Sequence, residues 1–395
     1  MTANKRRTIF HIDVNSAFLS WSAIKRLKED PASVDLRTIA SAVGGDVNSR
    51  HGVITARSIP AKKYGVVTGE PVVKALAKCP DLKIVEADFT VYKAYSASLM
   101  KLLKTYTPVV EQASIDEAYI DITGMVDIFV YEETDDEFPV NVANAIRNEV
   151  RSSLGFTVNI GISSNKLLAK MASDFEKPDK VHTLYPEEIG SKLWQLPINS
   201  LYGCGSSTAS RLKSLGIRTI GDAAAVDEAV LKAHLGEKHG SYIYRSANGM
   251  NDDEVNPEKE AAKGYSSETT LPHDINSDNY REEAPAVLKY LSENIAGRLK
   301  KDDVYAGTIS VQVKTDRFIK HSRQMKLSDP VNTAERIYEA ASLLLKRLLL
   351  GEQGLFSGNI SIRLIGISAS NLDKGSYRQI NMFDLMGIGM VYDEF

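Results

Sequence analysis

The chain has 395 residues, of which 43% are hydrophobic and 25% charged, and its formal net charge is −3. It is too long for one compact core, so we expect several domains of roughly 100 residues each. No run of about 20 apolar residues is present, which excludes a membrane-spanning protein. Cys79 and Cys204 stand alone, without the spacing of a zinc site or a disulfide framework. Since Ile9–Val14 is also too short and too acidic for a signal peptide, we expect a cytoplasmic protein.

Strand-like and helical segments alternate through residues 1–184, which is typical of a mixed α/β domain. The expected strands are Ile9–Val14, Thr38–Val43, Gly52–Ala56, Val109–Ile115 and Thr157–Ile162.

The first expected strand leads directly into a helix. Strand alternation places Phe10 and Ile12 on one face and Asp13 at the open end of the other. Asn15 and Ser16 are predicted to cap the following helix. Asp13 would then lie at a strand-to-helix junction, where the free amides of a helix N-terminus can bind phosphate oxygens.

A second acidic site follows in Ser114–Asp121. Neighbouring side chains on a regular strand point to opposite faces, so Asp116 and Glu117 can converge only at a bend. We therefore predict that they lie at the tip of a hairpin beside Asp13. Three carboxylates there would hold two Mg²⁺ ions about 3.5–4 Å apart. The alternative is that these acids are solvated residues at strand ends.

The second half of the chain is organised differently. Residues 185–247 are predicted to be helical, and the acidic segment Asn248–Glu260 is predicted to be a solvated linker. Helices at about 280–301 and 333–350 then interrupt strands, which indicates a small α+β domain. These strands are expected at Gly264–Pro272, Ala306–Lys314, Ile319–Leu327 and Asn359–Ile367.

Three sequence blocks resemble the signatures of the Y-family translesion DNA polymerases, in their bacterial polymerase IV and UmuC-like branches. The blocks are FHIDVNSAFLSW, SIDEAYIDIT and VNIGISSNKLLAKMASDFEKPDK. The resemblance implies an α+β multidomain fold, the right-hand polymerase, with a palm, fingers, a helical thumb and a C-terminal little finger. The implied bounds are 1–16 and 86–184 for the palm, 17–85 for the fingers, 185–247 for the thumb, 248–262 for the acidic linker, 263–373 for the little finger and 374–395 for a tail.

The same resemblance implies template-directed, low-fidelity synthesis past damaged bases in the DNA-damage (SOS) response. No segment is left for a proofreading exonuclease, so we expect none. The protein is expected to act as a monomer apart from a sliding clamp, on primer-template DNA and incoming dNTP. The chain also ends without a finished element, so a longer natural C-terminus is expected to be possible.

Resemblance also implies roles for the residues of the active site. Two Mg²⁺ ions, for which Mn²⁺ can substitute, would be bound by Asp13, the Val14 carbonyl, Asp116 and Glu117. The triphosphate would meet the Ala17 and Phe18 amides and the Lys177 side chain. Phe18 falls at the steric-gate position, where an aromatic ring leaves no room for a ribose 2′-hydroxyl.

The block Ile54–Gly65 departs from the family pattern. The family commonly has a tyrosine where Ile59 stands and an arginine where Lys62 stands. Isoleucine cannot donate a hydrogen bond to phosphate, and lysine lacks the bidentate fork of arginine. Lys62 is therefore the expected phosphate contact of this segment, ahead of Lys63 and Arg57.

DNA contacts are expected in both later domains. In a helix–hairpin–helix-like segment, Leu201–Ile217, Gly203 and Gly205 would bring backbone amides to phosphate. Five basic residues of the last domain would follow the template backbone: Lys314, Arg317, Lys320, Arg323 and Lys326. The tail resembles a clamp-binding peptide, with Gln379, Met382 and Phe383 as its anchors.

Two other functions remain open from the residues alone. A nucleotidyl cyclase also uses paired carboxylates and Mg²⁺, and Gly44-Gly45-Asp46 superficially resembles a cyclase signature. The departures at Ile59 and Lys62 would also allow a DNA-binding damage-response subunit with weak catalysis. Mg²⁺-dependent primer extension distinguishes the polymerase from both.

Overall fold

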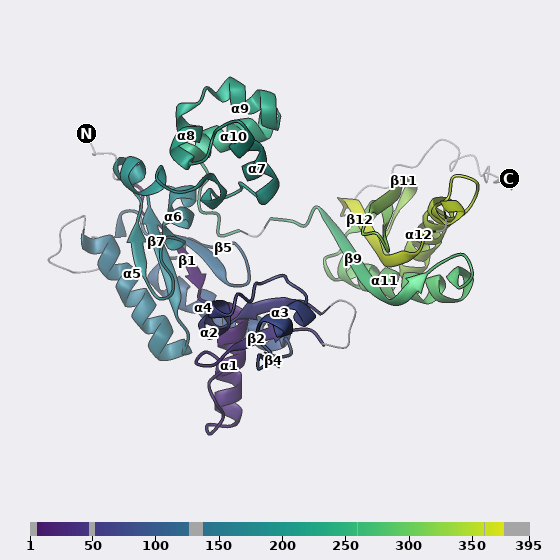
Figure 1. The fold of residues 1–395 in the computed structure, drawn as a ribbon, viewed down its shortest axis with the longest axis horizontal. Coiled ribbons are helices and arrows are strands. Elements are labelled where there is room, and N and C mark those ends of the chain that lie inside the picture. Colours follow the sequence, from purple (N-terminus) through teal and green to yellow (C-terminus); the bar gives the residue numbers. More distant parts are fainter. Residues whose placement is uncertain (1–5, 47–51, 126–136, 259, 359, 375–395) are drawn as a thin grey trace. The chain divides into compact units, whose positions relative to one another are not determined.

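The computed structural model describes residues 6–46, 52–125, 137–258, 260–358 and 360–374 (Figure 1). The chain forms two compact units, Met1–Lys259 and Glu260–Phe395, and each is described by itself. Within the described residues, no helix is long and apolar enough to cross a membrane.

The core of the first unit is a five-stranded sheet in the order β5-β6-β1-β7-β8. Phe10 and Ile12 of β1 pack with α4 and α5 on one face, while α6 contacts β1 and β7 from the other. The sheet is thus buried on both faces, and β1 is its central strand. The strands are β1 (Ile9–Val14), β5 (Val110–Gln112), β6 (Glu117–Asp121), β7 (Val158–Ser163) and β8 (Val181–Thr183), and the helices are α4 (Phe89–Tyr106), α5 (Glu137–Glu149) with its π-helical end η2 (Val150–Leu154), and α6 (Lys166–Ser173).

Gly161 sets the distance between α6 and the sheet. A Cβ atom at this position of β7 would lie 2.0 Å from the carbonyl oxygen of Ala169 and 2.4 Å from the backbone nitrogen of Ser173. Only glycine allows the helix backbone to come this close. Since α6 also carries Lys170, this close approach brings that lysine to β1.

A smaller, three-stranded sheet with the order β3-β2-β4 carries its own apolar clusters. Pro60 stands in the first turn of α2, and the Ser58 side chain caps that helix. The elements are α1 (Ala17–Glu29), β2 (Ser41–Gly44), β3 (Ile54–Arg57), α2 (Ile59–Lys63), α3 (Val72–Lys78) and β4 (Lys83–Val85).

Short helices around one apolar cluster make up residues 186–247. They are η3 (Pro186–Glu188), η4 (Ile189–Leu193), η5 (Ile198–Ser200), α7 (Ser206–Ser214), α8 (Ile220–Ala225), α9 (Glu228–Leu235) and α10 (Glu237–Ala247). The prediction of a helical, short-looped segment is confirmed.

The second unit is a four-stranded antiparallel sheet in the order β11-β10-β12-β9. Helices α11 and α12 cover one face, and their apolar residues form one core with the strands (Figure 1). The elements are β9 (Gly264–Ile275), α11 (Tyr280–Lys301), β10 (Tyr305–Thr315), β11 (Lys320–Val331), α12 (Ala334–Leu349), η6 (Leu355–Gly358) and β12 (Ile362–Asp373).

Most predicted elements are present, and the differences have local causes. The expected strand Val109–Ile115 ends at Gln112, because the chain bends at residues 114–116. The sequence patterns do not predict the three-residue strands β4 and β8, since runs this short carry little periodicity.

The prediction that Asn248–Glu260 is a fully solvated linker is wrong for part of the segment. Val255 is 7% exposed and packs in a small apolar cluster with Ile9 and Tyr119. The Asn256 backbone nitrogen donates to Glu111 Oε2 at 2.7 Å. An apolar residue in an otherwise acidic run thus docks on the first sheet.

Candidate active site

The predicted carboxylates meet at neighbouring strands of the five-stranded sheet. Asp13, near the end of β1, lies directly opposite Glu117, the first residue of β6. Asp116 precedes Glu117 in the bend between β5 and β6, and its backbone oxygen accepts a 3.0 Å hydrogen bond from the Val14 nitrogen. The predicted hairpin tip beside Asp13 is therefore present.

Two lysines, one on α6 and one in the loop after it, form ion pairs with Asp13 and Glu117. The Lys170 ammonium lies 2.7 Å from Glu117 Oε1, 3.4 Å from Asp13 Oδ2 and 3.3 Å from Asp174 Oδ2. Lys177 Nζ lies 2.8 Å from Asp13 Oδ2 and 2.7 Å from Asp174 Oδ1. Asp13 therefore faces two cations.

The pKa of the Glu117 carboxyl is raised from its usual value, mainly by burial, although Lys170 opposes the shift. Burial disfavours the Lys170 ammonium, but the hydrogen bond with Glu117 and the charge of Asp13 outweigh this and raise the lysine pKa. The pKa of His11 is well below its usual value, because the ring is buried beside two cationic lysines. His11 is thus a neutral neighbour of the carboxylates.

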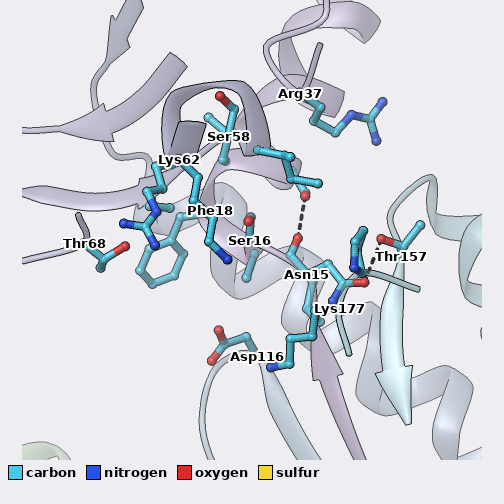
Figure 2. A pocket seen from close by; sticks show the side chains of 18 of the residues that line it. Asn15, Ser16, Phe18, Arg37, Ser58, Lys62, Thr68, Asp116, Thr157 and Lys177 are labelled. Carbon is cyan, nitrogen blue, oxygen red and sulfur yellow. Dashed lines mark hydrogen bonds between the residues drawn. The ribbon is translucent and has the colours of Figure 1, made fainter. Parts of the chain in front are cut away.

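A cavity of about 570 Å³ is lined by Asp13. Asp116, Phe18, Lys62 and Lys177 surround the same cavity (Figure 2). It brings together seven of the residues predicted for metal and nucleotide binding: Asp13, Val14, Ala17, Phe18, Lys62, Asp116 and Lys177. The eighth, Glu117, does not line it and instead turns to Lys170.

In the part of the chain that the structure describes, no three acidic, histidine or cysteine side chains form a ready metal cluster. Asp116 Oδ1 accepts a hydrogen bond from Ser114 Oγ at 2.7 Å, and the other two carboxylates pair with lysines. The donors nevertheless fit a divalent cation such as Mg²⁺, because they are carboxylate oxygens from two paired strands and the bend that precedes one of them. A cation there would replace the ammonium groups as the partner of the acids.

Phe18 lies in the first turn of α1 and lines the cavity. Its ring stacks on Tyr92 with a centroid distance of 4.7 Å and an interplanar angle of 14°. The Tyr92 hydroxyl is in turn hydrogen-bonded to Ser22 at 2.7 Å. The predicted gate residue is therefore a supported wall of the cavity.

The predicted capping of α1 is wrong in its detail. Ser16 is the N-cap residue, but it adopts a left-handed conformation with φ 47°, and its side chain makes no capping bond. The Asn15 side chain is turned to β7 and to the loop around Asp179 instead. The first amides of α1 are thus left without a side-chain cap, as a phosphate site requires.

The far wall of the cavity comes from β3 and α2. Ile59 is 51% exposed and lines the cavity without a donor group, and Lys62 stands one turn later. Arg57 also lines the cavity and donates to the Val66 carbonyl. Three of the segment's predicted residues thus face the cavity, while Lys63 does not line it.

The basic residues of the C-terminal domain do not share one face. Lys314 lies opposite Lys320, and with Lys326 they project from the sheet face that the helices leave open. Arg323 lies opposite Val311, a core residue, so strand alternation places it on the helix-covered side. Arg317 is in the turn between β10 and β11. The alternation of side chains along β11 places Arg323 on the opposite face from the three lysines. A count of basic residues in the sequence does not reveal this difference.

The two glycines of the helical segment differ. Gly203 has φ +80°, and a Cβ atom there would lie 2.5 Å from the Tyr242 ring, so its role is to pack. Gly205 is the N-cap residue of α7 and has nothing within 4 Å of its Cβ position. Of the two, only Gly205 offers open space to a phosphate. The predicted clamp anchors Gln379, Met382 and Phe383 lie outside the described residues.

Three family models match the chain. The impB/mucB/samB family matches residues 12–174, its C-terminal domain matches residues 262–382, and the thumb domain of DNA polymerase-iota matches residues 199–251. Together they cover the carboxylate sheet, the helical segment and the C-terminal unit.

Curated relatives match over nearly the full length. A protein of Clostridium acetobutylicum named DNA polymerase IV is 41% identical over 96% of this chain and 90% of its own. DNA polymerase IV 1 of Bacillus subtilis is 33% identical over 96% and 86%. A solved Y-family DNA polymerase chimera superposes with a TM-score of 0.75 at 23% identity, covering 92% of this chain and 99% of its own.

The chain belongs to the Y family of DNA polymerases. Its fold is therefore the right-hand polymerase, with palm, fingers, thumb and little finger, as the sequence predicts. It is a DNA-directed DNA polymerase of the translesion type, with primer-template DNA and dNTP as substrates, and it uses divalent metal ions.

The sequence patterns do not single out Lys170, which contacts two of the predicted carboxylates. It is 8% exposed in a helix whose residues from Leu167 to Ser173 are all buried. A lysine flanked by Ala169 and Met171 on a fully apolar stretch needs a buried acidic partner, and that pattern could have identified it.

Proposed function

We propose that this Y-family polymerase binds the primer end and the incoming dNTP in the cavity in front of Asp13. Two Mg²⁺ ions, for which Mn²⁺ can substitute, would be held by Asp13, the Val14 carbonyl, Asp116 and Glu117. The observation that carries the proposal is that Asp13 and Asp116 share one cavity with Lys177, while Glu117 faces Asp13 across paired strands. When bound, the ions supply the positive charge that favours ionisation of the primer 3′-hydroxyl and neutralises the leaving pyrophosphate.

The chain's own groups would position the triphosphate. Lys177 would exchange its pairing with Asp13 for phosphate oxygens, because a cation bound at Asp13 removes the need for the ammonium. Lys62 would contact the phosphates from the fingers, and the Ala17 and Phe18 amides would meet them at the start of α1. Catalysis is then mostly positioning and charge stabilisation.

The Phe18 ring would select the sugar. It enters the cavity stacked on buried Tyr92, so it cannot swing away from an added 2′-hydroxyl without breaking that contact. Exclusion of this kind rejects a larger substrate by steric conflict rather than by loss of a hydrogen bond.

DNA would be held without base recognition. Lys314, Lys320 and Lys326 on the open face of the little-finger sheet would contact template phosphates, with Arg317 at the turn, and Arg323 would contribute from the edge strand β11. The α7 amides beyond Gly205 would bind a duplex phosphate.

The clamp interaction rests on the sequence. Gln379, Met382 and Phe383 would dock in the sliding clamp and raise the local concentration of the enzyme at primer ends. Deleting residues 379–383 should reduce clamp-stimulated synthesis and leave basal synthesis intact. Loss of both would point to a folding role.

We also propose that the domains have the bounds given by the family resemblance. The protein would act as a monomer in the cytoplasm. Its synthesis would be of low fidelity and without proofreading.

Extension of a primed template, intact or with an abasic site, tests the function. Wild type should extend both with Mg²⁺. Asp116→Ala should lose about 1000-fold or more in extension rate and keep its affinity for DNA within about twofold, because the carboxylate serves chemistry rather than binding. Extension by Asp116→Ala at the wild-type rate would exclude this metal site.

A further inference from the structure

The loop that carries Lys177 runs from the end of α6 at Ser173 to β8 at Val181. It holds Lys177 Nζ 2.8 Å from Asp13 Oδ2, yet the lysine side chain is long and its loop has no regular hydrogen-bonded structure of its own. Besides its ion pairs with Asp13 and Asp174, the place of this ammonium therefore depends on the contacts that hold the loop backbone.

One such contact is the Asn15 side chain, which is 9% exposed. Its Oδ1 accepts a hydrogen bond from the Asp179 backbone nitrogen at 2.9 Å. It also accepts one from Thr157 Oγ1 at 2.9 Å (Figure 2). Its Nδ2 donates to Asn159 Oδ1 at 3.0 Å. Asn15 thus connects the end of β1 to β7 and to the loop.

Asn159, which is 0% exposed, continues the connection. It lies opposite Asp13 in the register of β1 and β7. Its Nδ2 donates to the carbonyls of Ser173 at 3.1 Å and Glu176 at 2.6 Å, and its Oδ1 accepts from the Lys180 nitrogen at 3.4 Å. The two amides together hold the loop backbone on both sides of Lys177.

The opposite side of the loop is also anchored. Arg147 donates to the Asp179 carbonyl at 3.0 Å, and Arg151 forms an ion pair with the Asp179 carboxylate. Asp179 is therefore held between α5–η2 and Asn15. Neutral amides suit the side near Asp13, because an amide can donate and accept at once without adding charge beside the carboxylates.

We propose that Asn15 and Asn159 are positioning residues that set the place of Lys177 against the triphosphate. The inference rests on the proposed role of Lys177. A point charge held on a flexible stem binds phosphate best when its backbone is fixed in advance, since less freedom is lost on binding.

The test compares Asn15→Ala, Asn159→Ala, Lys177→Ala and the double variant Asn15→Ala/Lys177→Ala. Nucleotide Kd is measured on a chain-terminated primer, where no bond can form, beside KM and kcat on an extendable one. Ser163→Ala is the matched control, because Ser163 is a fully buried polar residue of the same strand whose bond goes to Leu184 rather than to the loop.

Each single asparagine variant should raise the nucleotide Kd and KM about tenfold and change kcat less than about threefold. In the Lys177→Ala background, Asn15→Ala should add less than about twofold, because the two residues act through one group. Ser163→Ala should lower the unfolding temperature without changing Kd. If Asn15→Ala does not fold, Thr157→Val, which removes one donor to Asn15, should raise Kd in the same direction by a smaller factor.

If Asn15→Ala raises the nucleotide Kd by the same factor in the Lys177→Ala background as in the wild type, the inference is overturned. The proposed role of Lys177 would remain intact. The inference would also be overturned by a nucleotide Kd in Asn15→Ala that stays at the wild-type value with only a loss of stability, as in Ser163→Ala. An unchanged Kd in Lys177→Ala alone would overturn the proposed role of that lysine, and the inference with it.

Discussion

The carboxylate site of the palm and the open face of the little-finger sheet both carry lysines, but in opposite electrostatic settings. In the palm, Lys170 and Lys177 are paired with carboxylates at 2.7–3.4 Å. On the sheet, Lys314, Lys320 and Lys326 form no ion pair with the described residues. Lysines in ion pairs at fixed distances are typical of a catalytic site. Exposed lysines without acidic partners are typical of a surface that binds nucleic acid in a salt-dependent and sequence-independent way.

The largest expected effect comes from disturbing the packing of α6 against Gly161 in the palm sheet. Gly161→Ala would force a Cβ atom into the α6 backbone, so unfolding free energy should fall by about 3 kcal/mol and activity should be lost with the displacement of Lys170. Denaturant unfolding followed by circular dichroism measures the change.

Gly297→Ala is its control, because that helical glycine has nothing within 4 Å of its Cβ position. This variant should be as stable as the wild type or slightly more so. Equal stability of the two variants would contradict the close approach of α6 to the sheet.

A second effect tests whether the cavity selects by shape. Phe18→Ala removes the ring that stacks on Tyr92, and discrimination between dNTP and rNTP, measured as the ratio of their kcat/KM values, should fall about 100-fold. Ile59→Ala, a cavity-lining control that is 51% exposed in the wild type, should leave the ratio unchanged. Sugar selectivity that survives in Phe18→Ala would remove the gate assignment.

The little-finger side is tested by salt. The triple variant Lys314→Ala/Lys320→Ala/Lys326→Ala should weaken DNA binding about tenfold near 0.1 M salt and reduce the slope of log Kd against log salt by about 2–3. Fluorescence anisotropy at several salt concentrations measures both. Exposed lysines on the helix side, Lys289, Lys300 and Lys346, provide a charge-matched triple that should leave the slope unchanged. Equal losses in both triples would assign the effect to net charge alone.

The smallest effect concerns Glu117. The folded protein raises its pKa above the usual 4.5, so its contribution to stability is full below that pH and is lost as pH rises through the higher folded value. Without divalent metal, Glu117→Gln should therefore unfold about 2 °C above wild type at pH 7.5, and this difference in unfolding temperature should disappear toward pH 4.

Added Mg²⁺ should raise the unfolding temperature of the wild type more than that of the variant. A variant less stable at every pH would mean that the Lys170 bond outweighs burial.

The main elements could be predicted because their periodicity is strong. The buried strand Ile9–Val14 has the predicted bounds, and α11 spans Tyr280–Lys301, as expected from an amphipathic run of that length. The predicted strand Val109–Ile115 is too long, because apolar residues continue through a bend that brings Asp116 to the cavity.

The sequence predicts those site residues whose type alone indicates their chemistry. It does not predict which side chains form hydrogen bonds or ion pairs with one another. Asp13, Asp116 and Glu117 stand out as acids beside apolar strands. The turn of Glu117 toward Lys170 depends on how closely α6 packs on Gly161, which no local pattern encodes. The proposed positioning role of Asn15 likewise depends on its hydrogen bond with Asn159, which is 144 residues away in the sequence.

The ammonium of Lys170, set among Asp13, Glu117 and Asp174, has a consequence for how the enzyme is made. A newly synthesised chain can fold with these carboxylates partly compensated by its own lysines, so we expect folding not to require an ion from the surroundings. A chelator should therefore switch the enzyme off without unfolding it, and resupplied Mg²⁺ should restore synthesis at once.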